Sequence, residues 1–161
     1  MHITLVQLSI EELRGLAAGK PAGHFAGASE GALPPPHVAA RALRQVEEGM
    51  AAFWCVPFLV VAEAEGTVLG GCTFKGTPSH GEVEIAYGVA KSARGRGVAT
   101  AAVSQLVQLA ATDRSVSRVV AEILPANLAS SKVVSRVGFT EGETFVDAEG
   151  DSVVRWTLLL D

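Results

Sequence analysis

Hydrophobic residues recur with two spacings along this chain, and each spacing predicts a different element. Alternating apolar and polar positions are typical of a half-buried strand, whereas apolar residues three or four apart are typical of a helix with one buried face. Alternating or uniformly apolar runs predict strands over 1–8, 58–64, 68–74, 82–89, 118–124, 140–146 and 153–160. Helical spacing predicts helices over 9–19, 37–49, 97–112 and 127–137.

The order of these elements predicts how they assemble. Turn residues at 65–67 and 147–150 join neighbouring strands into hairpins, because glycine and aspartate suit tight turns. Residues 82–124 have the order strand, helix, strand, which requires two parallel strands joined by a right-handed crossover. The sequence therefore predicts a single α/β (α+β) domain over 1–161. Its mixed, mostly antiparallel central sheet has about seven strands with one parallel strand–helix–strand unit, flanked by about four helices.

Residues 20–36 form the longest irregular stretch, which is rich in glycine and alanine and ends in Pro34-Pro35-Pro36. A loop of this length in a compact domain is often a binding loop or a lid. A plain surface connection is the alternative interpretation, and the sequence leaves both open.

Composition narrows the class of protein. The 161 residues are 48% hydrophobic with a formal net charge of -4, which excludes an intrinsically disordered chain and argues against a protein that coats nucleic acid. The longest apolar run, 50–62, is broken by Pro57 and is shorter than the roughly 20 residues of a membrane-spanning helix. No basic segment followed by a long apolar one opens the chain. We therefore expect a cytoplasmic protein without nucleic-acid or membrane partners.

The two cysteines, Cys55 and Cys72, neither make a disulfide framework nor have the spacing of a zinc motif. Both are expected to be small buried hydrophobic residues. The sequence accordingly predicts no metal site.

The segment that carries chemistry is 89–100, which leaves a predicted strand and opens a predicted helix. Gly95 and Gly97 allow a tight turn and a close backbone approach, and Arg94 and Arg96 add cations. The first N–H groups of a helix lack partners within it and the helix dipole is positive there, so the loop suits a phosphate. The P-loop needs Gly-Lys followed by Ser or Thr, and the dinucleotide fingerprint needs a third glycine; this segment has neither.

These residues resemble a known family. Arg94-x-x-Gly97-x-Ala99 resembles the acetyl-CoA-binding signature of the GNAT superfamily of N-acetyltransferases, (Gln/Arg)-x-x-Gly-x-(Gly/Ala). Residues 127–139 resemble the family's Asn-x-x-(Ala/Ser) helix that ends in Gly-Phe, and 82–89 resemble its fourth strand. The Asn-x-x-Ser form of this motif resembles that of the ribosomal-protein N-acetyltransferase branch. The order of elements is similar to that of the family over nearly the whole chain.

The resemblance implies acetyl-CoA as cosubstrate and places it on particular residues. The end of the fourth strand pairs with the pantetheine arm, the following loop takes the pyrophosphate through backbone N–H groups, and Asn127 contacts the pantetheine region. Lys132 and Arg136 are either partners of the nucleotide phosphates or solvated helix charges. The implied cofactor-binding residues are Val89, Ala90, Arg94, Gly95, Arg96, Gly97, Val98, Ala99, Thr100, Asn127 and Ser130.

The implied chemistry needs a base. An amine must be neutral to attack a thioester, yet a lysine-like amine has a pKa of about 10.4 in water. Strand alternation puts Glu82 and Glu84 on one face of 82–89, with Cα atoms roughly 7 Å apart. Family members often use a glutamate on this strand as the base, and we favour Glu84 over Glu82. The alternative is that one or both lie at the exposed strand start or pair with an arginine.

One position departs from the family. Many members have a tyrosine four residues after the Ala/Ser position as general acid, whereas this chain has Val134, and its one tyrosine is Tyr87. Ser130 or Ser131 acting through water is one replacement, and departure of the thiolate without an acid is another, since thiol pKa values are about 8.5. The backbone N–H of Val89 is the expected oxyanion donor. The implied catalytic residues are Glu84, Glu82 and Ser130.

The resemblance implies transfer of an acetyl group from acetyl-CoA to a primary amine of a small molecule, protein or peptide, by direct attack in a ternary complex. One alternative, which Val134 keeps open, is a non-catalytic CoA-binding sensor or partner domain of the same fold. Another is a nucleotide-binding protein of a different class, which would bind ATP or NAD. Homodimers are frequent in such families, so a homodimer is also open, and acceptor specificity is expected in residues 20–57.

Overall fold

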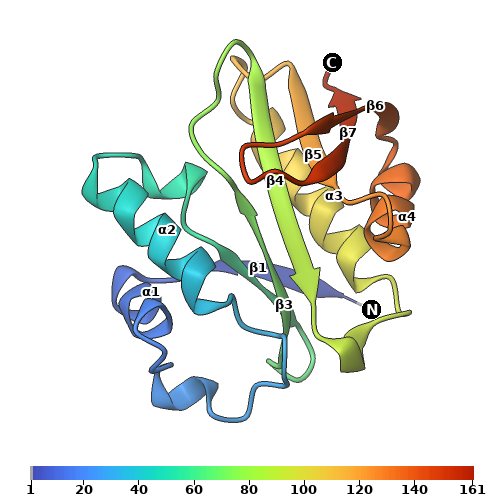
Figure 1. Cartoon of the computed structure of the whole chain (residues 1–161). Coiled ribbons are helices and arrows are strands. Elements are labelled where there is room, and N and C mark those ends of the chain that lie inside the picture. Colours follow the sequence, from blue (N-terminus) through green and yellow to red (C-terminus); the bar gives the residue numbers. More distant parts are fainter. Residues whose placement is uncertain (1) are drawn as a thin grey trace.

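The computed structural model describes residues 2–161 and contains one sheet of seven strands in the order β1-β2-β3-β4-β5-β7-β6 (Figure 1). Neighbouring strands are antiparallel except β4 and β5, which run parallel as the crossover predicted. The predicted first strand included Met1, which lies outside the described residues. The strands are β1 (Ile3–Gln7), β2 (Phe58–Ala62), β3 (Val68–Phe74), β4 (Glu82–Val89), β5 (Arg118–Ile123), β6 (Thr140–Val146) and β7 (Ser152–Leu159).

In the part of the chain that the structure describes, four α-helices flank the sheet, so the predicted architecture is confirmed. They are α1 (Ile10–Ala17), α2 (Pro36–Glu47), α3 (Val98–Ala111) and α4 (Leu128–Val137). Three short 3-10 helices, which the hydrophobic pattern did not predict, lie in connecting segments: η1 (Gly23–Phe25), η2 (Ala52–Trp54) and η3 (Lys91–Ala93). None of the described helices has both the length and the apolarity needed to cross a bilayer.

Local sequence explains where the helices begin and end. The Ser9 hydroxyl accepts from the N–H of Glu12 at 3.1 Å and the Glu12 carboxylate accepts from the N–H of Ser9 at 2.8 Å, which makes a capping box. Gly138 ends α4 in the left-handed region with φ 115°, as predicted. α2 begins at Pro36, earlier than predicted, because proline's fixed φ and missing N–H suit the first helical position.

Helices cover the two faces of the sheet unequally. One hydrophobic core, which includes Leu13, Ala42 and Leu59, packs α1 and α2 against β2. The other includes Ile85, Leu106 and Val119 and packs α3 and α4 against the opposite face. On the α1–α2 side, β4, β5 and β7 instead carry partly exposed charged side chains, namely Glu82, Glu84, Arg118, Glu122 and Arg155.

Both cysteines are free and buried, with 2% of each residue exposed, which confirms their predicted role as core residues. Burial raises the pKa of the Cys72 thiol on β3 to about 12. At neutral pH this thiol is therefore protonated and unreactive.

Candidate functional site

β4 and β5 part after a short parallel ladder. Within the described chain, the ladder covers Glu82–Glu84 of β4. Farther along β4, Ala90 directs its backbone toward β3, where its N–H donates to the carbonyl of Leu69 at 2.8 Å. Because backbone groups alternate sides along a strand, the N–H of Val89 faces β5, beyond the end of the ladder. The predicted oxyanion donor thus points into an opening in the sheet.

The opening belongs to a cavity of about 1060 Å³. Its wall comes from β3, β4, the segment 91–95, the N-terminus of α3, one side of α4, and the loop 30–35 with the start of α2. Part of the irregular stretch therefore lies against the cavity, as the binding-loop interpretation requires. Predicted cofactor-binding residues in the wall are Val89, Arg94, Gly95, Gly97, Val98, Ala99, Thr100, Asn127 and Ser130.

Four predicted site residues lie outside the cavity wall. Ala90 is 1% exposed, and Arg96 donates from Nη2 to a backbone carbonyl of η3 at 3.2 Å. Glu82 and Glu84 lie farther back on β4, and Ala86 is the first β4 residue of the wall. Glu84 can therefore take a proton from an amine substrate only if the amine reaches past Ala86 or if a water molecule lies between them.

The loop before α3 has the backbone shape that its glycines predict. Gly95 and Gly97 have φ values of 78° and 76°, in the left-handed region that favours glycine. Gly97 is the N-cap of α3 and no side chain of residues 2–161 caps the helix, so the N–H groups of its first turn are open toward the cavity. The helix dipole adds positive potential at the same place, which suits an anion.

Charged side chains in the cavity wall are mostly cationic. Lys91 and Arg94 precede α3, and Lys132 and Arg136 project from α4. Glu30 is the one acidic residue among the described residues of the wall. Although the chain has a net charge of -4, this cavity therefore has a local cationic surplus beside the open helix N-terminus.

The start of α4 is held in place by two contacts on Ser130. Asn127 caps the helix, since its Oδ1 accepts from the N–H of Ser130 at 3.1 Å. The Tyr87 hydroxyl donates to the carbonyl of Ser130 at 2.8 Å, and burial raises the Tyr87 pKa to about 12. Val134 is fully buried in the core, so the position of the family's usual tyrosine lies outside the cavity wall here. The tyrosine that does line the cavity comes from β4.

Glu82 is paired with arginines, which is the alternative role that the sequence left open for it. The Arg118 Nε donates to Glu82 at 2.9 Å, and Arg155 donates to its other oxygen. Burial opposes ionisation of Glu82, but the two arginine hydrogen bonds outweigh it and hold its pKa below the ordinary value. Glu82 thus joins β4, β5 and β7, and its catalytic role stays a prediction.

Replacing this carboxylate should destabilise the fold in a pH-dependent way. Glu82→Gln is expected to lower the free energy of unfolding at neutral pH by about 1–2 kcal/mol, because the network is charged but partly exposed. Since the folded-state pKa is depressed, the stabilisation is full above the unfolded value of about 4.3 and is lost as the pH falls through the folded value. Urea unfolding from neutral pH down to about pH 3 should show the two proteins converging; a constant difference would assign the loss to packing.

Two charged residues beside Glu84 were missed by the sequence analysis. Lys75 donates from Nζ to the Glu84 carboxylate at 3.0 Å. Glu122 of β5 has a pKa raised by burial first and by the charge of Glu84 second. The signal for Glu122 was a lone carboxylate in a strand that is apolar apart from Arg118 at its start and that pairs with the strand of Glu84.

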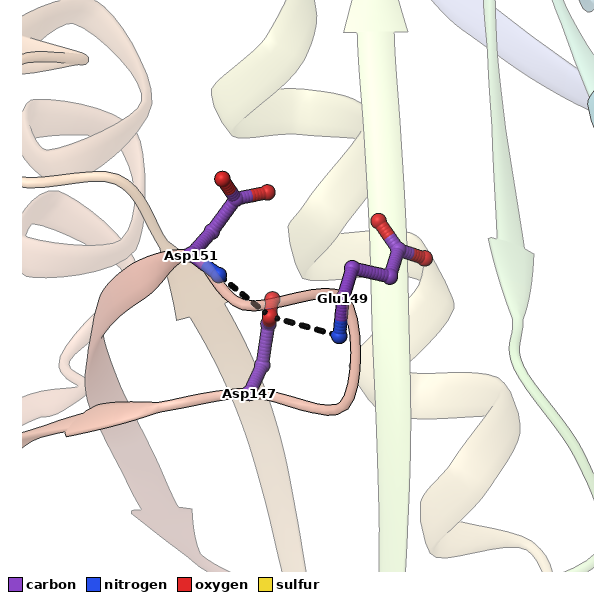
Figure 2. A group of neighbouring side chains, drawn as sticks. All are labelled: Asp147, Glu149 and Asp151. Atoms are coloured by element: carbon purple, nitrogen blue, oxygen red, sulfur yellow. Dashed lines mark hydrogen bonds between the residues drawn. The ribbon is translucent and has the colours of Figure 1, made fainter.

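Three carboxylates gather at the β6–β7 turn, where Asp147, Glu149 and Asp151 can bring one oxygen each within 4.8 Å of the others (Figure 2). Asp147 Oδ1 accepts from the N–H of Glu149 at 3.0 Å and of Asp151 at 2.9 Å. These bonds are those of an aspartate that builds a tight turn. The geometry of the turn therefore accounts for the closeness of the three carboxylates.

Solved structures share this fold. Aminoglycoside acetyltransferase AAC(6')-Ib in complex with coenzyme A matches with a TM-score of 0.68 and 19% identity, over 98% of this chain and 95% of that one. The ribosomal-protein-S5-alanine acetyltransferase from Vibrio fischeri matches with a TM-score of 0.70 and 15% identity, over 100% of this chain and 94% of that one. At these identities the likeness establishes the fold alone.

Sequence comparison identifies the family of this chain. An uncharacterized N-acetyltransferase of Bacillus subtilis (strain 168), YjdG, is 31% identical over 83 residues, which are 51% of this chain and 49% of that protein. The chain thus matches about half the length of this curated relative. The family model described as "Acetyltransferase (GNAT) domain" matches residues 2–140. Because that match spans most of the chain, the chain belongs to the GNAT acetyltransferase family, as the signature around Arg94 and Gly97 implied.

Proposed function

We propose that this chain binds acetyl-CoA in the cavity beside β4 and transfers the acetyl group to a primary amine. The observation that carries the proposal is the opening in the sheet, where the Val89 N–H lies near an uncapped, cation-flanked helix N-terminus. A ligand that joins phosphates to an acylated thiol suits both parts of such a cavity. The structure of AAC(6')-Ib contains coenzyme A, which supports the same type of ligand for this fold.

The phosphates would accept hydrogen bonds from the open N–H groups of Val98, Ala99 and Thr100 in the first turn of α3. Arg94 lines the same part of the wall and adds a fixed positive charge. The arm of the ligand would then lie along the end of β4, next to Val89 and Ser130.

The acceptor amine would approach on the face of β4 that carries Glu84 and attack the thioester carbon directly. The C–N bond forms and the C–S bond breaks, the amine proton passes to Glu84 directly or through water, and the thiolate leaves and takes up a proton. The Val89 N–H donates to the carbonyl oxygen while that oxygen carries negative charge. Ser130 lies in the wall and would assist the thiolate through water.

Incubation with acetyl-CoA and a panel of primary amines, following release of free thiol, tests the proposal. We expect at least one amine to raise the rate above hydrolysis. Tight CoA binding without stimulation by any amine would favour a CoA-binding sensor or partner domain instead. A thermal shift with ATP or NAD that exceeds the shift with CoA would overturn the ligand assignment itself.

The cations of α4 should contribute to ligand affinity. Lys132→Gln and Arg136→Gln are each expected to raise the CoA Kd about 2–10-fold, because exposed charge-assisted bonds to phosphate are worth roughly that much. The effect should shrink as salt is added. Arg114→Gln is the matched control, since Arg114 is exposed and outside the cavity wall. Equal CoA affinity in all three variants would indicate that Lys132 and Arg136 are solvated helix charges that do not contact the ligand.

A further inference from the structure

Gly88 is an unusual residue of β4. It lies in the cavity wall on the same face as Glu84, directly before Val89, and it is the one exposed residue of this strand. Glycine inside a strand weakens the strand, and it often marks a place where a ligand approaches the backbone closely. The position therefore needs an explanation from the fold or from the site.

The fold does not require glycine at this position. The φ of Gly88 lies outside the left-handed region, and a Cβ there would meet no atom of the described residues within 4 Å. Gly70 on β3 is different, because a Cβ at that position would stand 2.3 Å from the carbonyl oxygen of Gly88. Strand packing explains Gly70, whereas the missing side chain at Gly88 leaves free space inside the cavity.

That space lies where an acceptor has to be. The Val89 N–H faces the opening, and neighbouring Cα atoms are about 3.8 Å apart, so a carbonyl held by this N–H brings the reacting carbon beside Gly88. Gly71 pairs with Gly88 across the strands, and a Cβ on Gly71 would stand 3.7 Å from Pro34 Cγ. Gly71 and Gly88 therefore form one side of this space, and the loop 30–35 forms another.

Resting on the acetyl transfer proposed above, we propose that Gly88 is a specificity-determining residue that admits primary amines branched at the amine-bearing carbon. The substituents of that carbon are two bonds from the attacking nitrogen, so they would occupy the space that a side chain at Gly88 would fill. An unbranched amine carries only hydrogens there and extends away from the strand. Gly88 therefore widens the acceptor range rather than supporting the fold.

The test compares Gly88→Ala and Gly88→Val with the wild type on n-butylamine and sec-butylamine, isomers that differ in branching at the amine-bearing carbon. Valine suits a strand, so the backbone should be kept, and thermal unfolding checks this. Thr144→Val is the matched control, because Thr144 is an exposed strand residue of β6 that lies outside the cavity wall and outside residues 20–57. Thiol release gives kcat/KM, and calorimetry gives CoA affinity.

We expect Gly88→Val to lower kcat/KM for sec-butylamine roughly 10–100-fold more than for n-butylamine, the discrimination that a few methyl groups give in a pocket. Gly88→Ala should be intermediate, and Thr144→Val should match the wild type, with CoA affinity unchanged throughout. If Gly88→Val fails to fold, Gly88→Ala carries the comparison.

An unchanged ratio of the two amine rates in the Gly88 variants would overturn the assignment while leaving acetyl transfer intact. Weaker CoA binding with equal loss on both amines would also overturn it, since the side chain would then act on the donor. A wild-type protein that binds CoA yet releases no thiol with either amine would overturn the acetyl transfer and this assignment together.

Discussion

Glu84→Gln is expected to lower the rate of amine acetylation by about 10²–10⁴-fold, the usual contribution of a general base, while CoA affinity stays near that of the wild type. Glutamine keeps the size of the side chain and its contact with Lys75 but cannot accept the amine proton. Glu84 lies outside the cavity wall, so CoA should bind normally. Thiol-release kinetics and calorimetry on the same samples measure the two quantities.

The pH dependence separates loss of a base from loss of structure. As the pH rises toward the pKa of the amine, about 10, the amine becomes neutral without help and the deficit of Glu84→Gln should shrink. Glu65→Gln in the exposed turn between β2 and β3 is the matched control and should leave the rate unchanged. Wild-type turnover in Glu84→Gln would contradict the assignment, and a larger loss in Glu82→Gln would move the base to Glu82.

Gly97→Ala should weaken CoA binding by about tenfold or more, because a displaced hydrogen bond to a charged group is worth roughly 1.5–3 kcal/mol. The φ of 76° at Gly97 is unfavourable for alanine, so the loop must shift just where the first N–H groups of α3 are open. Titration calorimetry with CoA measures the loss directly.

Gly19→Ala separates this effect from general strain. Gly19 has a φ of 73° and open space around it, as Gly97 has, but it follows α1 and lies outside the cavity wall. Both substitutions should lower thermal stability to a similar extent, whereas only Gly97→Ala should weaken binding. Equal CoA affinity in the two variants would contradict the proposal that the N-terminus of α3 binds the phosphates.

Local chemistry in the sequence was enough to predict the backbone turn at Gly95 and Gly97 and the faces of β4. Glycine at Gly95 and Gly97 is required by the backbone itself, and strand alternation alone separates buried Ile85 from partly exposed Glu84. Ser9 and Gly138 likewise act within their own helices. Such features depend on residues close in the chain, so they can be inferred before any tertiary structure is known.

The partners of the glutamates could not be predicted in the same way. Arg155 reaches Glu82 across 73 positions of the chain, and Glu122 approaches Glu84 because β5 pairs with β4 in one particular register. Where the loop 30–35 lies against the cavity depends on how α2 packs on the sheet. Each of these contacts is fixed by strand register or helix packing, which hydrophobic periodicity does not specify.

The early end of the β4–β5 ladder divides the sheet into two halves, β1 to β4 and β5 to β7. Within residues 2–161 the halves share backbone pairing over Glu82–Glu84 and the adjoining N–H bonds of Ser117 and Arg118 to the Gly81 carbonyl. Packing of α3 and α4 and the arginine bonds to Glu82 also join the halves. A ligand that lies between them would contact both halves at once. Its binding free energy would then add to the cohesion of the whole sheet, so that saturation with ligand and global stability become thermodynamically linked quantities.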